Sequence, residues 1–190
     1  IDAYYSRGCD SSELFADSEI AAKDSYSAHL NKYNVIHIDV SSFWDAYKDN
    51  VIEKIQEYIY DELKQVYGDQ IDYTKMISAV LMSVYNISGI PFVIIIDEWD
   101  CVIRNGGNKT LVHSYLQFLH LLFKSEESKT FLALAYITGI LPIKKIKDES
   151  ALNNFREFTM LKSKQLTRYF GFTEDEVKKL CITYDMDFES

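Results

Sequence analysis

The stretch Pro91 to Asp100, PFVIIIDEWD, decides the fold of this 190-residue chain. Its five residues from Phe92 to Ile96 are all β-branched or aromatic, which predicts a central parallel strand buried on both faces. Three acids follow at once, namely Asp97, Glu98 and Asp100. Open α/β sheets bind ligands in the crevice beyond the carboxyl ends of their strands, so these carboxylates are candidates for Mg²⁺ binding and for general-base chemistry.

The segments around this strand predict an alternation of strands and helices. Two further strands are expected at Tyr33 to Val40 and at Phe131 to Ile137, and a short fourth strand within Ala151 to Met160. Helical spacing or capping signals predict helices over about 51–66, 76–85, 108–123 and 174–182. This alternation is typical of a doubly wound parallel sheet, and the length favours one domain over residues 1–190.

Composition narrows the class of protein. A content of 47% hydrophobic and 14% aromatic residues is enough to bury a core. The net charge of -9 argues against a chain that coats nucleic acid or an anionic membrane, and the nearly uncharged run Thr130 to Pro142 is too short to span a bilayer. Three widely spaced cysteines indicate neither a disulfide framework nor a zinc site, so a cytoplasmic protein is expected.

An apolar strand that ends in Asp-Glu is the Walker B pattern of P-loop NTPases, in which the acid helps to hold Mg²⁺ on the phosphates. The alternative interpretation is a strand that ends in a solvated acidic turn. No GxxxxGK[ST] phosphate loop occurs in these 190 residues. The pattern therefore predicts half of a nucleotide site.

Several ordered motifs resemble one family. They are, in chain order, AYYSRGCDSSELF (3–15), HLNKYNVIHIDVSS (29–42), IDEWDCVIR (96–104), LAYITGILPIKK (134–145), SALNNFREFTM (150–160) and YFGFTEDEVKKLC (169–181). They resemble the bacterial AAA-ATPase-like family, whose members are often fused to a C-terminal nuclease-like domain of the PD-(D/E)XK type. The resemblance implies a P-loop NTPase-like parallel sheet flanked by helices in three αβα layers, with the phosphate loop and its strand expected upstream.

The resemblance also implies roles for particular residues in binding ATP and Mg²⁺. Asp97 would be the Mg²⁺-side acid, acting through water, and Glu98 the base that activates the attacking water. Asp100 would be a supporting acid in cofactor binding. Thr138 would occupy the sensor position at the end of the next strand, and Arg156 would supply a basic group near the γ-phosphate.

Three functions are weighed on this basis. The first is an ATP-hydrolysing module that is coupled to an attached nuclease-like domain and is inactive as these residues alone. The second is a non-catalytic regulatory domain that binds a partner through the region 141–170, where seven basic residues stand against three acids. The third, a nuclease centre in the acids themselves, is weak because E-x-K occurs only at Glu62 to Lys64, within a helical pattern.

The resemblance has one consequence for assembly. A fold of this kind places the phosphate-loop strand beside the strand Phe131 to Ile137. Without the phosphate-loop strand, the apolar edge of the strand Phe131 to Ile137 would be exposed, and such edges pair with other chains. We therefore expect these 190 residues to self-associate, to exchange elements, or to be covered by an upstream segment.

Overall fold

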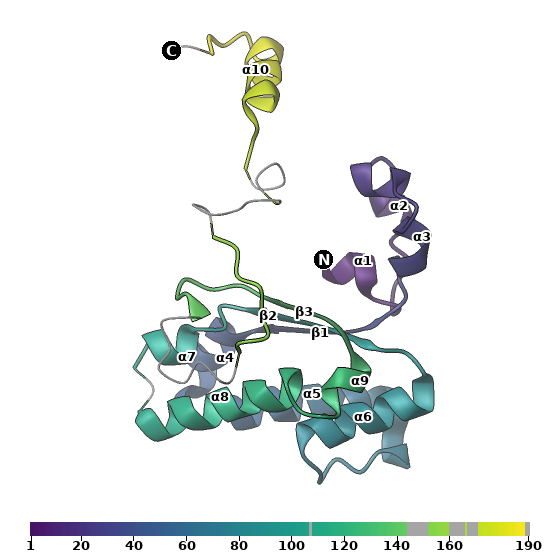
Figure 1. Cartoon of the computed structure of the whole chain (residues 1–190), viewed down its shortest axis with the longest axis vertical. Helices are drawn as coiled ribbons and strands as arrows, with labels where there is room; N and C mark the ends of the chain where they lie inside the picture. Colours follow the sequence, from purple (N-terminus) through teal and green to yellow (C-terminus); the bar gives the residue numbers. More distant parts are fainter. Residues whose placement is uncertain (107, 144–151, 160–165, 167–170, 189–190) are drawn as a thin grey trace. The chain divides into compact units, whose positions relative to one another are not determined.

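A computed structural model describes residues 1–106, 108–143, 152–159, 166 and 171–188 of the chain (Figure 1). These residues form two compact units, Ile1–Asn154 and Phe155–Ser190, which are described separately. The first unit holds the sheet and the acidic stretch. That residues 1–190 behave as one domain stays a prediction.

The sheet of the first unit has three parallel strands in the order β1-β2-β3. The strands are β1 (Asn34–Asp39), β2 (Phe92–Asp97) and β3 (Leu132–Ile137). The register of β1 and β2 places Asp39 opposite Asp97, and the register of β2 and β3 places Ile96 opposite Ile137. The parallel α/β sheet predicted from the sequence is therefore confirmed, with the acidic strand in the middle.

Burial explains why β2 is the central strand. Its five apolar residues are all at most 5% exposed, as expected for a strand covered on both faces and paired on both edges. On β1, Ile36 and Ile38 are buried while His37 between them is exposed. On β3, Ala133 and Leu134 are exposed, so this edge strand is the least covered of the three.

The helices and short 3-10 turns follow the predicted alternation. In chain order they are α1 (Asp2–Tyr5), α2 (Ser12–Phe15), η1 (Glu19–Ala22), α3 (Tyr26–His29), α4 (Val40–Tyr47), η2 (Lys48–Asn50), α5 (Val51–Tyr67), η3 (Gly68–Gln70), α6 (Ile77–Ser88), α7 (Cys101–Arg104), α8 (Lys109–Phe123), α9 (Ser128–Phe131) and, in the second unit, α10 (Glu174–Thr183). Figure 1 shows α5, α6 and α8 along one face of the sheet. Helix α1 contacts β1, where Asp2 pairs with the exposed His37 at 3.5 Å. Because His37 points away from its buried neighbours, this contact lies on the opposite face, and helices flank the sheet on both sides.

Local signals in the sequence set the helix ends. Helix α5 stops at Gly68 and α6 at Gly89, and both glycines have positive φ angles, 52° and 67°. Helix α8 begins after Asn108, whose side chain accepts a hydrogen bond of 2.9 Å from the amide of Leu111. The capping box of α10 forms between Thr173 and Glu176 as predicted.

Two parts of the prediction differ from the structure. Helices α4 and α7 are present although neither was predicted, because both are short and follow the strand ends directly. The fourth strand expected within Ala151 to Met160 was wrong for the described residues 152–159, which hold a turn followed by chain without strand pairing. A strand needs a hydrogen-bonded neighbour, and this polar segment offers no apolar run to bring one.

None of the helices in the described part of the chain is long and apolar enough to cross a membrane.

Candidate functional site

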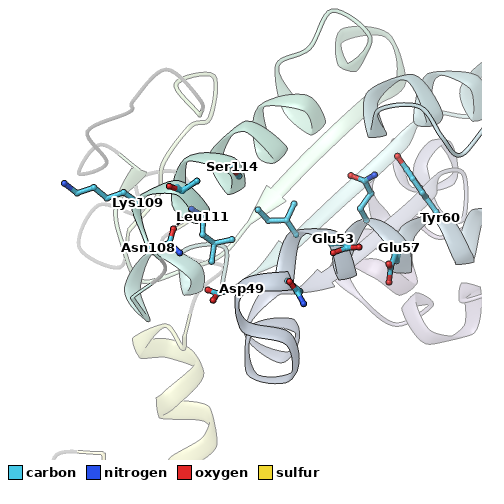
Figure 2. A pocket seen from close by; sticks show the side chains of 12 residues that line it. Asp49, Glu53, Glu57, Tyr60, Asn108, Lys109, Leu111 and Ser114 are labelled. Atoms are coloured by element: carbon cyan, nitrogen blue, oxygen red, sulfur yellow. Dashed lines mark hydrogen bonds between the residues drawn. The ribbon is translucent and has the colours of Figure 1, made fainter.

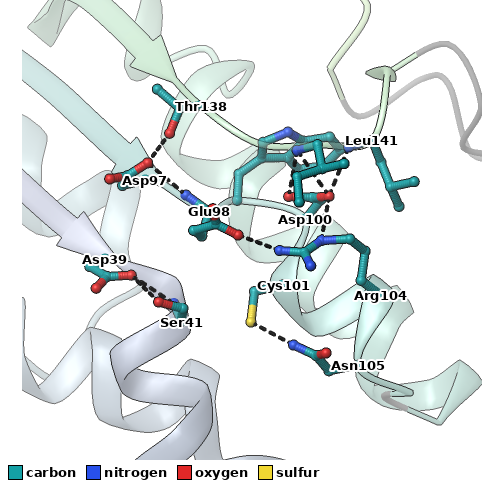
Figure 3. Close-up of polar contacts among 12 residues, drawn as sticks. Asp39, Ser41, Asp97, Glu98, Asp100, Cys101, Arg104, Asn105, Thr138 and Leu141 are labelled. Atoms are coloured by element: carbon teal, nitrogen blue, oxygen red, sulfur yellow. Dashed lines mark hydrogen bonds and ion pairs between the residues drawn. The ribbon is translucent and has the colours of Figure 1, made fainter.

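The predicted acids lie at the carboxyl edge of the sheet, where β1, β2 and β3 all end (Figure 3). Asp97 is the last residue of β2 and is exposed, although the five residues before it are buried. Thr138 follows β3 directly. The parallel register brings these two side chains together because the ends of neighbouring parallel strands share one edge.

Asp97 and Thr138 are joined by a hydrogen bond in which the threonine hydroxyl donates to Oδ1 of the aspartate. The amide of Glu98 donates to the same oxygen at 3.0 Å. Both bonds use Oδ1, and Oδ2 accepts no hydrogen bond from the residues that the structure describes. Two main-chain bonds extend the pairing of β2 and β3 past the strands: Thr138 N donates to Ile96 O at 2.9 Å, and Trp99 N to Thr138 O at 3.0 Å. These two main-chain hydrogen bonds therefore set the distance between the side chains of Asp97 and Thr138.

Glu98 sits in a left-handed backbone conformation with φ 52°. This conformation is uncommon for a residue with a side chain, costs about 1–3 kcal/mol, and is concentrated at functional sites. The turn directs the carboxylate of Glu98 toward Arg104 at the end of α7, whose Nη2 donates to Oε2 (Figure 3). The Glu98 side chain is 38% exposed. One of its oxygens is therefore engaged by the arginine while the group remains open to solvent.

Asp100 lies in a different environment from Asp97 and Glu98, because it is completely buried. Its Oδ2 accepts hydrogen bonds of 2.8 Å from Arg104 Nε and 2.8 Å from the amide of Leu141, and the amide of Ile140 lies 3.3 Å from both oxygens. A buried carboxylate is stable only when charge and hydrogen bonds compensate its lost hydration. Asp100 thus ties α7 to the segment that follows β3.

Gly139 is required for this close approach. A Cβ atom at this position would lie 2.5 Å from Asp100 Oδ1 and 2.6 Å from Trp99 Cδ1, distances at which atoms overlap. Only glycine allows the chain after Thr138 to come near enough to present its amides to Asp100. Gly139 therefore has a steric role directly after Thr138, the residue for which the resemblance implies the sensor position.

Two buried side chains near the acidic turn, those of Tyr115 and Cys101, form hydrogen bonds. The hydroxyl of Tyr115 donates to Trp99 O at 2.8 Å, and complete burial raises the pKa of this tyrosine far above its usual range, so it acts as a donor. Asn105 Nδ2 donates to Cys101 Sγ at 3.0 Å. Burial, the largest influence, raises the pKa of the Cys101 thiol, which keeps it protonated and unreactive.

Asp39 at the end of β1 caps helix α4. Its Oδ1 accepts hydrogen bonds from the amide of Ser41 at 2.9 Å and from its hydroxyl at 2.6 Å, and Oδ2 accepts one from Ser42 at 2.6 Å. The sequence predicted the strand over Tyr33 to Val40 but not this cap. An aspartate followed by serines after an apolar strand is a recognisable N-cap signal.

The other predicted site residue, Arg156, belongs to the second unit. There its guanidinium lies over the ring of Phe158, 5.1 Å from the ring centre. Its predicted place near a γ-phosphate stays a prediction. Of the residues chosen from the sequence, the structure brings together Asp97, Glu98 and Thr138, and it places Asp100 in the core beside them. The sequence did not point to Arg104, although its position four residues after Asp100 is a spacing at which ion pairs form on a helix.

A cleft of about 940 Å³ lies elsewhere in the first unit (Figure 2). Residues of α5 and α8 and of the turns that precede them line it, and they include Asp49, Glu53 and Glu57 but a single lysine, Lys109. Three carboxylates against one cation disfavour a polyphosphate. None of the predicted site residues lines this cleft.

The parallel sheet and the acids at its carboxyl edge define an α/β domain of the P-loop-like class. The family model described as predicted AAA-ATPase matches residues 1–147, which include all three strands and the acidic edge. This chain belongs to that AAA-ATPase-like family. No curated protein and no solved structure matches it.

Proposed function

We propose that this chain supplies the Walker B half of an ATP-hydrolysing site. The observation that carries the proposal is the exposed Asp97 at the end of a buried central strand, hydrogen-bonded to Thr138 of the next strand and followed by Glu98. Family membership supports nucleotide binding. Because these 190 residues contain no GxxxxGK[ST] motif, the proposal requires a phosphate loop from outside them.

Asp97 fits the Mg²⁺ side of such a site. Mg²⁺ keeps several waters and uses one or two carboxylates together with the phosphates of the substrate. Asp97 Oδ1 is held by Thr138 and by the amide of Glu98, which orients the carboxylate, and Oδ2, unbonded within the described part of the chain, would accept a hydrogen bond from a metal-bound water. No group of three or more potential ligand side chains occurs among the residues that the structure describes. A single carboxylate that acts through water suits a metal that is held largely by the nucleotide.

Glu98 is the proposed base. Its carboxylate is open to solvent and is fixed through Oε2 by Arg104, so Oε1 is the atom that would accept the proton from the attacking water. Thr138, whose hydroxyl proton is donated to Asp97, would orient this water by accepting a hydrogen bond from it. Bound ATP and Mg²⁺ would supply the phosphoryl group and neutralise its charge. Asp100 would support the site from the core.

We further propose that nucleotide state is passed to an attached nuclease-like domain. The alternative is a non-catalytic regulatory domain that keeps the NTPase fold and binds its partner through the basic region 141–170. Most of that region lies outside the described residues. Partner binding that is independent of nucleotide would favour this alternative.

The first test is calorimetry of Mg²⁺-ATP binding to residues 1–190 and to a chain extended upstream to include a phosphate loop. We expect binding only to the longer chain. If neither chain binds, the regulatory function replaces the ATPase. If residues 1–190 bind Mg²⁺-ATP without the upstream extension, the nucleotide lies away from the proposed site.

The second test is Glu98→Gln in the full-length protein. Removing a general base costs about 100-fold or more in turnover, whereas an affinity that depends on the phosphates should stay within about twofold. Glu126→Gln is the matched control, because Glu126 is an exposed glutamate in a surface pair with Lys129. Turnover that is unaffected by Glu98→Gln would contradict the assignment of the base.

A further inference from the structure

Arg104 makes two bonds with one guanidinium. Its Nε donates to Asp100 Oδ2 at 2.8 Å and its Nη2 donates to Glu98 Oε2 (Figure 3). The side chain is only 26% exposed. Because a guanidinium is planar and presents its donors in a rigid fork, fixing one edge on Asp100 also fixes the direction in which the other edge meets Glu98.

The Asp100 end of this link is buried and held by several hydrogen bonds. The carboxylate is completely buried and is held by the amides of Ile140 and Leu141 as well as by Arg104. The absence of a side chain at Gly139 brings those amides into range. Arg104 is therefore anchored to the segment that follows β3, the same segment that begins with Thr138.

The Glu98 end of this link is partly exposed to solvent. Its side chain is 38% exposed, and Arg104 is the one side chain bonded to its carboxylate among the residues that the structure describes. An exposed glutamate without such a bond samples several rotamers. A base must be held within a narrow range of positions, because small misplacements of a reacting group are costly.

We propose that Arg104 is a positioning residue for Glu98, anchored by buried Asp100 to the segment Thr138–Leu141. It holds the glutamate at the site edge through Oε2, and any shift of this segment is transmitted to Glu98 through Asp100 and Arg104. This inference rests on the proposed function, since it assumes that Glu98 is the base. It also assigns Asp100 to the anchoring of Arg104, with neither ATP nor Mg²⁺ as its direct ligand.

The test is Arg104→Lys in the full-length protein. A lysine keeps a positive charge beside buried Asp100, so the fold is retained, but a single ammonium cannot bridge two carboxylates with fixed geometry. We expect kcat for ATP to fall roughly ten- to a hundredfold, with KM changed less than about twofold. Arg7→Lys is the matched control, because Arg7 bonds Tyr67 and lies by Tyr33, near the amino end of β1 and away from the site.

A double mutant separates positioning from a general structural effect. If Arg104 acts through Glu98, Arg104→Lys will change the residual turnover of Glu98→Gln by less than about twofold. An equal fall in both backgrounds, or an unchanged kcat in the single mutant, would overturn the positioning role. Full-length wild-type protein that neither binds nor hydrolyses ATP would overturn the proposed function, and the positioning role with it, so the two failures are distinguishable.

Discussion

At the scale of single residues, the acids of one short stretch have different environments. Asp97 is exposed and accepts two hydrogen bonds on one oxygen, whereas Asp100, three residues later, is completely buried and is neutralised by Arg104. Glu98 between them takes a left-handed backbone conformation. The environment of each acid thus depends on the direction in which the turn points its side chain.

Gly139 offers a residue-scale test of this turn. Gly139→Ala places a methyl group within 2.5 Å of Asp100 and 2.6 Å of Trp99, both fully or almost fully buried. Overpacking of this kind costs about 1–3 kcal/mol, so we expect a lower free energy of unfolding in urea. Gly8→Ala is the control, because its Cβ would meet only Ser6 Oγ at 3.5 Å, an ordinary contact. Equal stability of the two variants would contradict the steric role of Gly139.

At the scale of elements, each strand end continues into a helix or turn that is fixed by polar side chains. Asp39 caps α4. Asp100 precedes α7 and accepts a hydrogen bond from Arg104 of that helix. Helices α4 and α7 have eight and four residues, too few to be stable alone. The Asp39 cap and contacts with β2 hold α4, whereas the bond between Arg104 and Asp100 and contacts with α4 and α8 hold α7, which is why apolar periodicity did not reveal either helix.

The Asp39 cap predicts a pH-dependent stability. Burial, the largest influence, raises the pKa of Asp39, but the hydroxyl and amide hydrogen bonds of Ser41 and Ser42 together outweigh it, so the pKa lies below the ordinary value of 3.8. The carboxylate binds its proton more weakly in the folded than in the unfolded chain. Its contribution to stability is therefore fully present above pH 3.8 and is lost as the pH falls through the lowered pKa.

Asp39→Ala should reduce the free energy of unfolding at pH 7 by about 0.5–2 kcal/mol. The gap between wild type and variant should stay constant down to about pH 5 and close below the ordinary pKa. Urea unfolding monitored by circular dichroism across this pH range measures both. Asp39→Asn, which keeps a capping oxygen without the charge, should lose less at pH 7. A gap that widens on acidification would contradict the sign of the Asp39 shift.

At the scale of the whole molecule, β3 is one of the two edge strands of the sheet, and no strand pairs with its outer side among the described residues. Strand β3 pairs with β2, and its Ala133 and Leu134 are exposed, the latter by 37%. An exposed apolar edge with unpaired backbone groups is a template for pairing with another chain. This matches the expectation drawn from the resemblance, and self-association of the 190 residues stays a prediction.

Light scattering during size-exclusion chromatography tests that prediction. We expect residues 1–190 to form dimers or larger species as concentration rises, and Leu134→Lys to shift them toward monomer, because a charged side chain on an edge strand opposes pairing. Leu14→Lys is the control, since Leu14 is also exposed, by 70%, but lies in α2 outside the sheet. A monomer at high concentration would contradict the prediction.

The fold class was predictable because its signals are local. The apolar run from Phe92 to Ile96, the helical spacing of α5, α6 and α8, and the stops at Gly68 and Gly89 are each visible within one segment. Asp97, Glu98 and Thr138 were predictable as site candidates because parallel strands end at one shared edge. Periodicity and strand direction were therefore enough to predict the sheet and the acids at its carboxyl edge.

The partners of those side chains required the tertiary structure. The burial of Asp100 depends on how closely the segment after β3 approaches α7, and the bond between Glu98 and Arg104 depends on a left-handed turn that no side-chain pattern announces. Such contacts join residues that are distant in sequence or separated by an unusual backbone angle. The sequence by itself therefore determined the sheet and the acids at its edge. Only packing between segments decided which acid faces solvent and which one anchors an arginine, because burial and hydrogen bonding depend on neighbours in space.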